Sequence, residues 1–130
     1  MIRTFWTLQS KIEDSLKKHK LTLAQFDLLA MLSGLDDPNQ QELARQLAVS
    51  KGNMVGLVNR LSRRGFVKRV PSREGRRENV IRLTAAGRKL VSAAMPDHLR
   101  LVTSMMNPLA GPEQEKLRVL LERLDERGTL

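Results

Sequence analysis

Residues 41–87 read QELARQLAVSKGNMVGLVNRLSRRGFVKRVPSREGRRENVIRLTAAG, and this stretch decides the fold. Between Arg45 and Lys89 the chain has thirteen Lys and Arg residues against two acids, Glu74 and Glu78, a net charge of +11. The remainder has ten Lys and Arg against twelve acids, a net charge of −2. A basic excess confined to one third of a protein is typical of a phosphate-backbone partner, because neutralised phosphates release their condensed counterions.

Two short helices joined by a turn are predicted at the start of this stretch. Asn39, with Glu42 three residues later, offers a cap for a helix that ends at Leu47. Ser50 is a good N-cap for the next helix, which we expect to end at Gly65. In both helices apolar residues recur at helical spacing, so the pattern predicts a helix-turn-helix.

The outward face of the second helix combines amides, cations and bare backbone, and it has no acid. Asn can bond adenine bidentately, Lys or Arg can bond guanine, and Gly lets the backbone approach closely. We therefore predict that this helix contacts double-stranded DNA; the alternative is an ordinary solvated basic face. The predicted DNA-binding residues of the cap and helix are Ser50, Lys51, Gly52, Asn53, Gly56, Asn59, Arg60, Arg63 and Arg64.

A β-hairpin is predicted after this helix. Residues 66–70 and 80–83 alternate with a period of two, which indicates two strands. Between them lies a polar tip, residues 71–77, that is longer than a tight hairpin needs. Its arginines, Arg73, Arg76 and Arg77, are expected to reach a flanking minor groove, whose negative potential favours Arg. Strands, tip and helices together predict a winged helix-turn-helix.

Amphipathic helices are expected on both sides of this domain. Residues 1–19 have helical periodicity, and Thr22 with Gln25 has capping-box spacing for a helix to about Ser33. Thr84 should cap a long helix from Ala85 into the region of Asn107, interrupted at Gly87 and kinked at Pro96. A last helix should start at Gly111-Pro112.

The predicted fold class is thus mostly α with a small β wing: a winged helix-turn-helix at residues 21–84, flanked by N- and C-terminal dimerisation helices at 1–20 and 85–130. The terminal helices carry more Leu, Ile and Met than the small central domain can bury. An intertwined homodimer is the simplest way to cover this apolar surface. The alternative is one larger monomeric helical core.

Composition excludes several other function classes. The chain has no cysteine, so disulfides, thiolate metal sites and thiol catalysis are ruled out. Its two histidines lack a second ligand at metal spacing, so we expect no metal, no cofactor, no catalytic residues and no enzyme activity. No apolar run reaches signal-peptide or membrane-spanning length, which favours a soluble, cytoplasmic protein without a membrane partner.

Four stretches resemble the multiple-antibiotic-resistance regulator (MarR) family of bacterial transcription factors: LTLAQFDLLAML at 21–32, QELARQLAVSKGNMVGLVNRL at 41–61, RGFVKRV at 64–70 and RRENVIRLTAAGRKL at 76–90. The resemblance implies a homodimer with interlaced terminal helices, whose two winged domains bind adjacent major grooves of a pseudo-palindromic operator. It also implies repression that a small, often aromatic or phenolic, anion relieves. One departure is Gly75, where the family's wing usually has an Asp that holds the arginine corresponding to Arg77; Glu74 or Glu78 is then the acid nearest in sequence.

We therefore predict a sequence-specific, dimeric transcriptional repressor. Trp6, Phe26 and His98 are the candidate residues for contact with a small-molecule effector. The first alternative is an architectural protein that coats DNA without an operator, for which the same charge and wing suffice. The second is a protein-interaction module, which would leave the charge of residues 45–89 unexplained.

Overall fold

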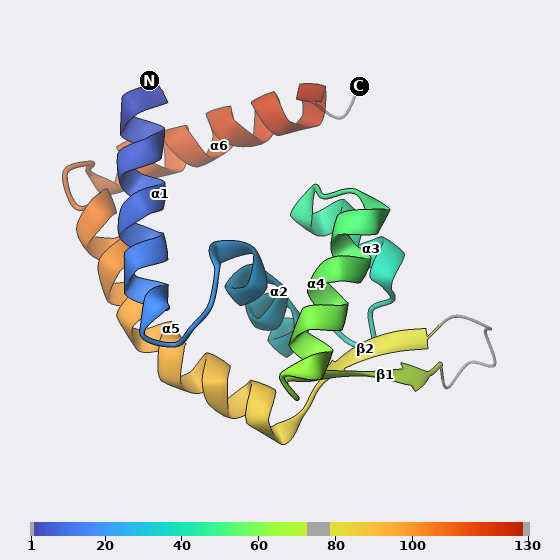
Figure 1. Ribbon diagram of the computed structural model, residues 1–130. Helices are drawn as coiled ribbons and strands as arrows, with labels where there is room; N and C mark the ends of the chain where they lie inside the picture. Colours follow the sequence, from blue (N-terminus) through green and yellow to red (C-terminus); the bar gives the residue numbers. More distant parts are fainter. Residues whose placement is uncertain (1, 73–78, 129–130) are drawn as a thin grey trace. The chain divides into compact units, whose positions relative to one another are not determined.

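The computed structural model describes residues 2–72 and 79–128 and is drawn in Figure 1. Its elements are α1 (Ile2–Lys17), α2 (Leu23–Gly34), α3 (Gln40–Leu47), α4 (Lys51–Arg63), β1 (Val67–Pro71), β2 (Asn79–Leu83), α5 (Ala85–Met106) and α6 (Gly111–Gly128). The two strands form an antiparallel sheet, so the prediction of a mostly helical winged helix-turn-helix is confirmed. The chain divides into two compact units, Met1–His98 and Leu99–Leu130.

Three helices begin at the polar caps that the sequence predicts. The Thr22 hydroxyl accepts from the backbone N–H of Gln25 at 3.2 Å, and the Gln25 side chain accepts from the Thr22 N–H at 3.1 Å. The Asn39 side chain accepts from the Glu42 N–H at 2.8 Å, and Ser50 caps α4 in the same way. Each cap satisfies a backbone donor that the helix cannot, which contributes about 1 kcal/mol.

The core of the first unit is aliphatic, with Phe26 as its one buried aromatic ring among the described residues. Buried residues come from α1, α2, α3, α4, both strands and α5, and they form one cluster. The fully buried large side chains are Leu16, Phe26, Leu28, Leu29, Leu43, Met54, Val58, Leu61 and Ile81. α4 therefore has one face fixed in this core.

The base of the wing is tied to the connection between α2 and α3. The Ile81 N–H donates to the Pro38 carbonyl at 2.9 Å, next to a bridge between Asn39 and Val80. One residue along, the Arg82 guanidinium binds the Asp37 carboxylate through two bonds of 2.7 and 2.8 Å. Two parallel charge-assisted bonds fix direction as well as distance, so β2 has a defined orientation against the helix-turn-helix.

α5 is one helix from Ala85 to Met106 and runs through both Gly87 and Pro96, so the prediction that these residues interrupt it was wrong. Gly87 lies in the first turn, where its N–H donates to the Thr84 hydroxyl at 3.0 Å. It is a packing residue, because a Cβ there would lie 2.1 Å from the Phe66 carbonyl oxygen. Pro96 removes one hydrogen bond from a helix of 22 residues, and the helix continues.

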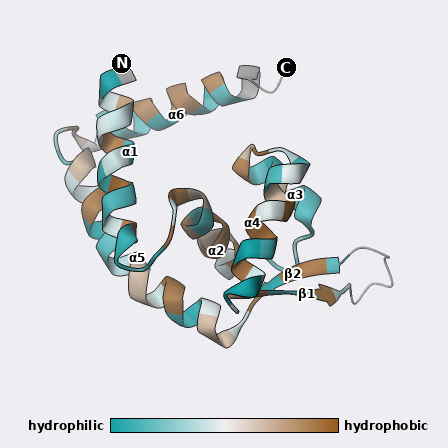
Figure 2. Ribbon diagram, in the orientation of Figure 1, coloured by the Kyte–Doolittle hydropathy of each residue, from teal (hydrophilic) through white to brown (hydrophobic). Residues whose placement is uncertain are grey.

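The second unit is a helical hairpin closed by Gln114. Its side-chain amide donates to the carbonyls of Met106 and Leu109 at 3.1 and 3.0 Å, which satisfies groups at the end of α5. Polar and apolar residues alternate along α6 in Figure 2. The apolar residues of α6 are exposed, namely Leu117, Val119, Leu120, Leu121 and Leu124. None of the helices in the described ranges is long and apolar enough to span a membrane.

Candidate nucleic-acid interface

α4 presents a polar, cationic face on the side opposite the core. Lys51, Gly52, Asn53, Arg60 and Arg63 are all exposed, and no acid occurs anywhere in the helix. The Lys51 ammonium lies in the first turn, where it opposes the positive end of the helix dipole. The fold therefore gains nothing from a cation at this position, which points to a role outside the fold.

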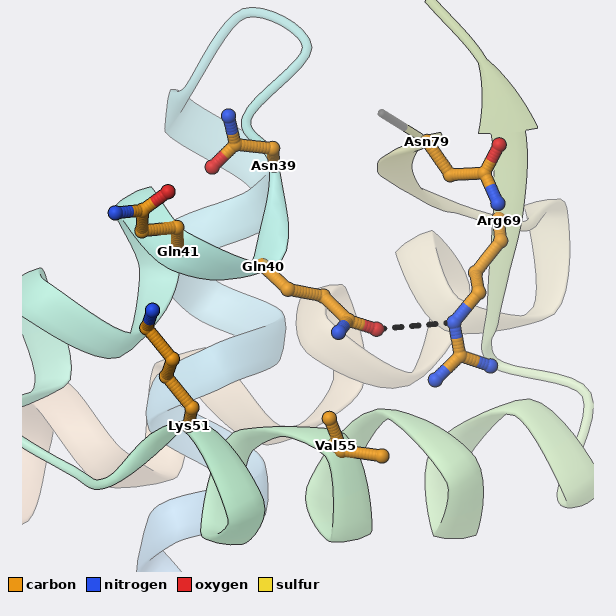
Figure 3. Close-up of a pocket in the computed structure, with 7 residues that line it drawn as sticks. All are labelled: Asn39, Gln40, Gln41, Lys51, Val55, Arg69 and Asn79. Atoms are coloured by element: carbon orange, nitrogen blue, oxygen red, sulfur yellow. Dashed lines mark hydrogen bonds between the residues drawn. The ribbon is translucent and has the colours of Figure 1, made fainter. Parts of the chain in front are cut away.

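An open pocket lies beside this face, between the start of α3, the first turns of α4 and the wing strands (Figure 3). Its lining contains amides, cations and one apolar side chain, and again no acid. The residues are Asn39, Gln40, Gln41, Lys51, Val55, Arg69 and Asn79. This composition suits phosphate oxygens and base edges, which accept hydrogen bonds from amides and cations.

Arg69 connects three elements at this pocket. From β1 its Nε donates to Gln40 Oε1 of α3 at 3.0 Å, and its Nη2 donates to Asn59 Oδ1 of α4 at 2.7 Å. Both acceptors are neutral, so these bonds hold the guanidinium in place without cancelling its charge. Arg69 thus fixes the wing strand against α4 and adds positive charge to the pocket.

The predicted DNA-binding residues divide into two groups in the structure. Lys51, Asn53, Arg60 and Arg63 lie exposed on α4, and Ser50 caps it. Arg64 instead donates to the Lys20 carbonyl at 2.8 Å and lies 5.0 Å above the Phe66 ring, so its side chain holds the end of α4 against the turn before α2.

The wing tip stays a prediction. Arg73, Arg76 and Arg77 lie outside the described residues, as do Glu74, Gly75 and Glu78. The two strands that carry the tip are described up to Pro71 and from Asn79, which pair with each other.

Gly52 and Gly56 occupy open positions on α4. A Cβ at either glycine would have no neighbouring atom within 4 Å, and neither has a left-handed backbone. Packing and backbone conformation would therefore accept alanine at both positions. Since glycine inside a helix costs about 0.5–1 kcal/mol relative to alanine, the fold alone does not account for these residues.

The three candidate effector residues are not brought together. Phe26 is 2% exposed in the core, and its ring centroid lies 4.6 Å from that of His98. Beside them, burial raises the pKa of Asp27 above its ordinary value, while His98 acts in the opposite direction. Trp6 is 60% exposed and packs edge-on against Phe5. Leu16, the residue of α1 that is buried in the core, comes ten residues after Trp6, which is about 15 Å along the helix.

Of the residues that line the pocket, only Lys51 was predicted to bind DNA, and sequence reasoning missed the other six: Asn39, Gln40, Gln41, Val55, Arg69 and Asn79. One signal for Val55 was available, because this apolar residue lies outside the helical stripe that contains Met54, Leu57, Val58 and Leu61. Among the described residues no cluster of His, Asp or Glu could hold a metal ion.

Comparisons with known proteins agree with this fold. A model of the MarR family matches residues 19–78. The transcriptional regulator PecS of Dickeya dadantii (strain 3937) is 27% identical over 112 residues, which cover 84% of this chain and 68% of PecS.

The structure of AbsC, a MarR family transcriptional regulator from Streptomyces coelicolor, aligns with a TM-score of 0.90 at 22% identity, over 97% of this chain and 87% of AbsC. The transcriptional repressor CouR of Rhodococcus jostii RHA1, bound to a 23-mer DNA duplex, aligns with a TM-score of 0.85 at 25% identity, over 95% of this chain and 87% of CouR. The resemblance to the MarR family is confirmed.

Proposed function

We propose that the chain, which is similar to the MarR family of transcriptional regulators, is a sequence-specific DNA-binding regulator. It represses as a homodimer that binds a pseudo-palindromic operator. The observation that carries the proposal is the open face of α4, which combines amides and cations with no acid beside a pocket of the same composition. A helix of this kind fits the major groove, where base edges offer mostly acceptors. The CouR repressor, which has this fold, was solved with DNA bound.

The residues of the face take different parts in this proposal. Asn53 lies in the first turn of α4, where a recognition helix contacts base edges. Lys51, Arg60 and Arg63 bind phosphates or guanine, and the tip arginines bind the flanking minor groove. Because the partner is chromosomal DNA, the protein acts in the cytoplasm.

The homodimer is supported by apolar surface at both ends of the chain. Phe5, Trp6 and Leu8 of α1 are exposed, and so is the leucine-rich surface of α6. Contiguous exposed apolar side chains of this size indicate a protein interface. A second copy of the chain would cover them and present two α4 helices to one duplex.

In this proposal a small aromatic anion also binds the protein and releases it from the DNA. CouR was solved with p-coumaroyl-CoA bound, and the structure of BpsR from Bordetella bronchiseptica concerns regulation of its DNA binding by 6-hydroxynicotinic acid, a small aromatic acid. Of the three candidate effector residues, Phe26 and His98 are in ring contact, and this contact supports the choice of these two residues.

In vitro selection of bound DNA from a random pool, at fixed salt, tests the proposed function. We expect a two-fold symmetric consensus whose half-site centres lie about one helical turn apart. Equal affinity for the selected and random DNA would instead support the architectural, DNA-coating alternative. Selection without two-fold symmetry would contradict the homodimer.

Lys51→Ala should weaken DNA binding without weakening the fold. If Lys51 binds one phosphate in each half-site, the slope of log affinity against log salt should fall by about one unit per contact. Stability should stay equal or rise slightly, since the cation opposes the helix dipole. Fluorescence anisotropy across a salt series measures the slope. Arg118→Ala is the control, because Arg118 is an α6 cation that is paired with Glu115 and Glu122; an equal change there would contradict a specific role for Lys51.

Gly56→Ala should have opposite effects on stability and binding. Alanine fits the open position and raises helix propensity, so the melting temperature should rise by about 2–6 °C. The added methyl group would stand between the helix backbone and the duplex, and affinity for the selected DNA should fall by about tenfold, of the order of one lost base contact. Calorimetry and anisotropy on one sample measure both effects. Unchanged affinity would show that this part of α4 does not approach DNA closely.

A further inference from the structure

Val55 is an aliphatic side chain on the polar face of α4. It is 40% exposed, whereas the apolar residues on the other side of the same helix are buried. In Figure 3 it lies on the pocket side of the helix, with Lys51 one turn before it and Arg69 across from it. A β-branched residue is not favoured in a helix, so neither propensity nor core packing accounts for a valine here.

The backbone on both sides of Val55 is bare. Gly52 is one turn before it and Gly56 follows it directly, and the positions of both Cβ atoms are open. The isopropyl group of Val55 is therefore flanked by two helix positions that carry no side chain, which leaves room for a flat partner. Single exposed apolar residues are common on protein surfaces. Val55 differs from such a residue because it is flanked by two helical glycines that packing does not require.

Asn59 adds a directed donor one turn further along the helix. An Arg side chain can only donate, so the atom that Arg69 Nη2 contacts at 2.7 Å must be the amide oxygen of Asn59. This contact leaves the NH₂ group of Asn59 for any partner. With one lone pair of its oxygen already engaged by Arg69, the Asn59 amide is better set to donate through its NH₂ group than to bond adenine bidentately.

We infer that Val55 and Asn59 together read a thymine in the major groove of each half-site. Thymine shows a methyl group and a carbonyl oxygen, O4, side by side on its major-groove edge. The Val55 isopropyl group packs against the methyl group, and the Asn59 NH₂ donates to O4. Residues four apart on a helix have Cβ atoms about 5–6 Å apart, so both side chains reach one base edge.

Arg69 is a positioning residue in this scheme. Its bond to Gln40 fixes its guanidinium, and its bond to Asn59 engages the amide oxygen, so the NH₂ group is the end of the amide that can donate to a base. The inference rests on the proposed DNA-binding function and assigns it one base. A repressor could read its operator without either side chain, so the thymine contact goes beyond the proposed function.

The test replaces thymines of the selected operator, one symmetric pair at a time, by deoxyuridine, which lacks only the methyl group. Wild-type protein should lose about 3- to 5-fold in affinity per half-site at one pair, the amount expected for one buried methyl group. The Val55→Ala variant should bind the operators with thymine and with deoxyuridine at that pair equally. Val70→Ala is the control, a half-buried valine of β1 that does not line the pocket, and it should keep the wild-type ratio.

Three results would separate the inference from the function it rests on. A wild-type protein insensitive to uridine at every pair, or a Val55→Ala variant that keeps the wild-type ratio, would overturn the thymine assignment and leave the repressor intact. A selection that yields no consensus would contradict the proposed function, and the inference would fall with it. Arg69→Met should lower the preference for thymine over cytosine, which shows an amino group in place of O4. The loss of affinity on replacing thymine by deoxyuridine should remain.

Discussion

Gly87→Ala is expected to lower the free energy of unfolding by about 3 kcal/mol, the upper end of what overpacking costs. The added Cβ would lie 2.1 Å from the Phe66 carbonyl oxygen and 3.2 Å from a methyl carbon of Leu83. The Phe66 carbonyl cannot simply move away, because it accepts from the Thr84 N–H at 3.0 Å while the Phe66 N–H donates to Leu61. Either α5 shifts or the connection between α4 and β1 breaks.

Urea unfolding followed by circular dichroism at a fixed protomer concentration measures this loss, and the melting temperature should fall by about 10 °C. Gly34→Ala is the matched control: Gly34 is the last residue of α2, and a Cβ there would have no neighbour within 4 Å. Its stability should be unchanged or slightly raised. If Gly87→Ala unfolded like the wild type, the close packing of α5 beneath Phe66 would be wrong.

The elements that the sequence predicts well are those with local causes. A cap such as Thr22, Asn39 or Ser50 bonds a backbone group three residues away, so both partners are visible in one short window. The strands follow from the alternation of residues 66–70 and 80–83, which predicts the ends of β1 and β2 to within one residue. Helix periodicity depends on the same short range, and it correctly separated the buried face of α4 from the open one.

The features that the sequence could not predict depend on partners far along the chain. Arg69 bonds Gln40, 29 positions earlier, and Arg64 bonds the carbonyl of Lys20, 44 positions earlier. From the sequence alone, both looked like two more cations in a basic run. Gly87 looked like an interruption in a helix, because the Phe66 carbonyl that excludes a side chain there comes from a different element.

These long-range bonds change how many cations of residues 45–89 are available to bind phosphates. Arg82 is neutralised by Asp37, while Arg64 and Arg69 donate to neutral oxygens of the protein. The cations that α4 leaves exposed are Lys51, Arg60 and Arg63. Because Arg82 is paired with a carboxylate and the Arg64 side chain is held by the Lys20 carbonyl, a count of formal charge overstates how many cations can exchange their counterions for phosphates, and the measured salt slope should be lower than the net charge of this window suggests.

The second large effect is expected at Phe26. Phe26→Ala should lower the free energy of unfolding by about 3–5 kcal/mol, because it removes a ring that is 2% exposed and leaves a cavity among buried leucines. The ring also loses its contact with His98, whose centroid lies 4.6 Å away. Phe5→Ala, the matched control, changes a phenylalanine that is 59% exposed and should cost much less in the isolated protomer.

The same position separates a core role from a role in effector binding. Phe26→Leu keeps most of the apolar volume, so its unfolding free energy should fall by no more than about 1.5 kcal/mol. If Phe26 only supports the core, Phe26→Leu should release DNA at the same effector concentration as the wild type. A Phe26→Ala variant with nearly wild-type stability would contradict the core assignment, since a ring that can be removed without cost does not hold α2 in place. The effector role would then be the better explanation of why an aromatic residue stands beside His98.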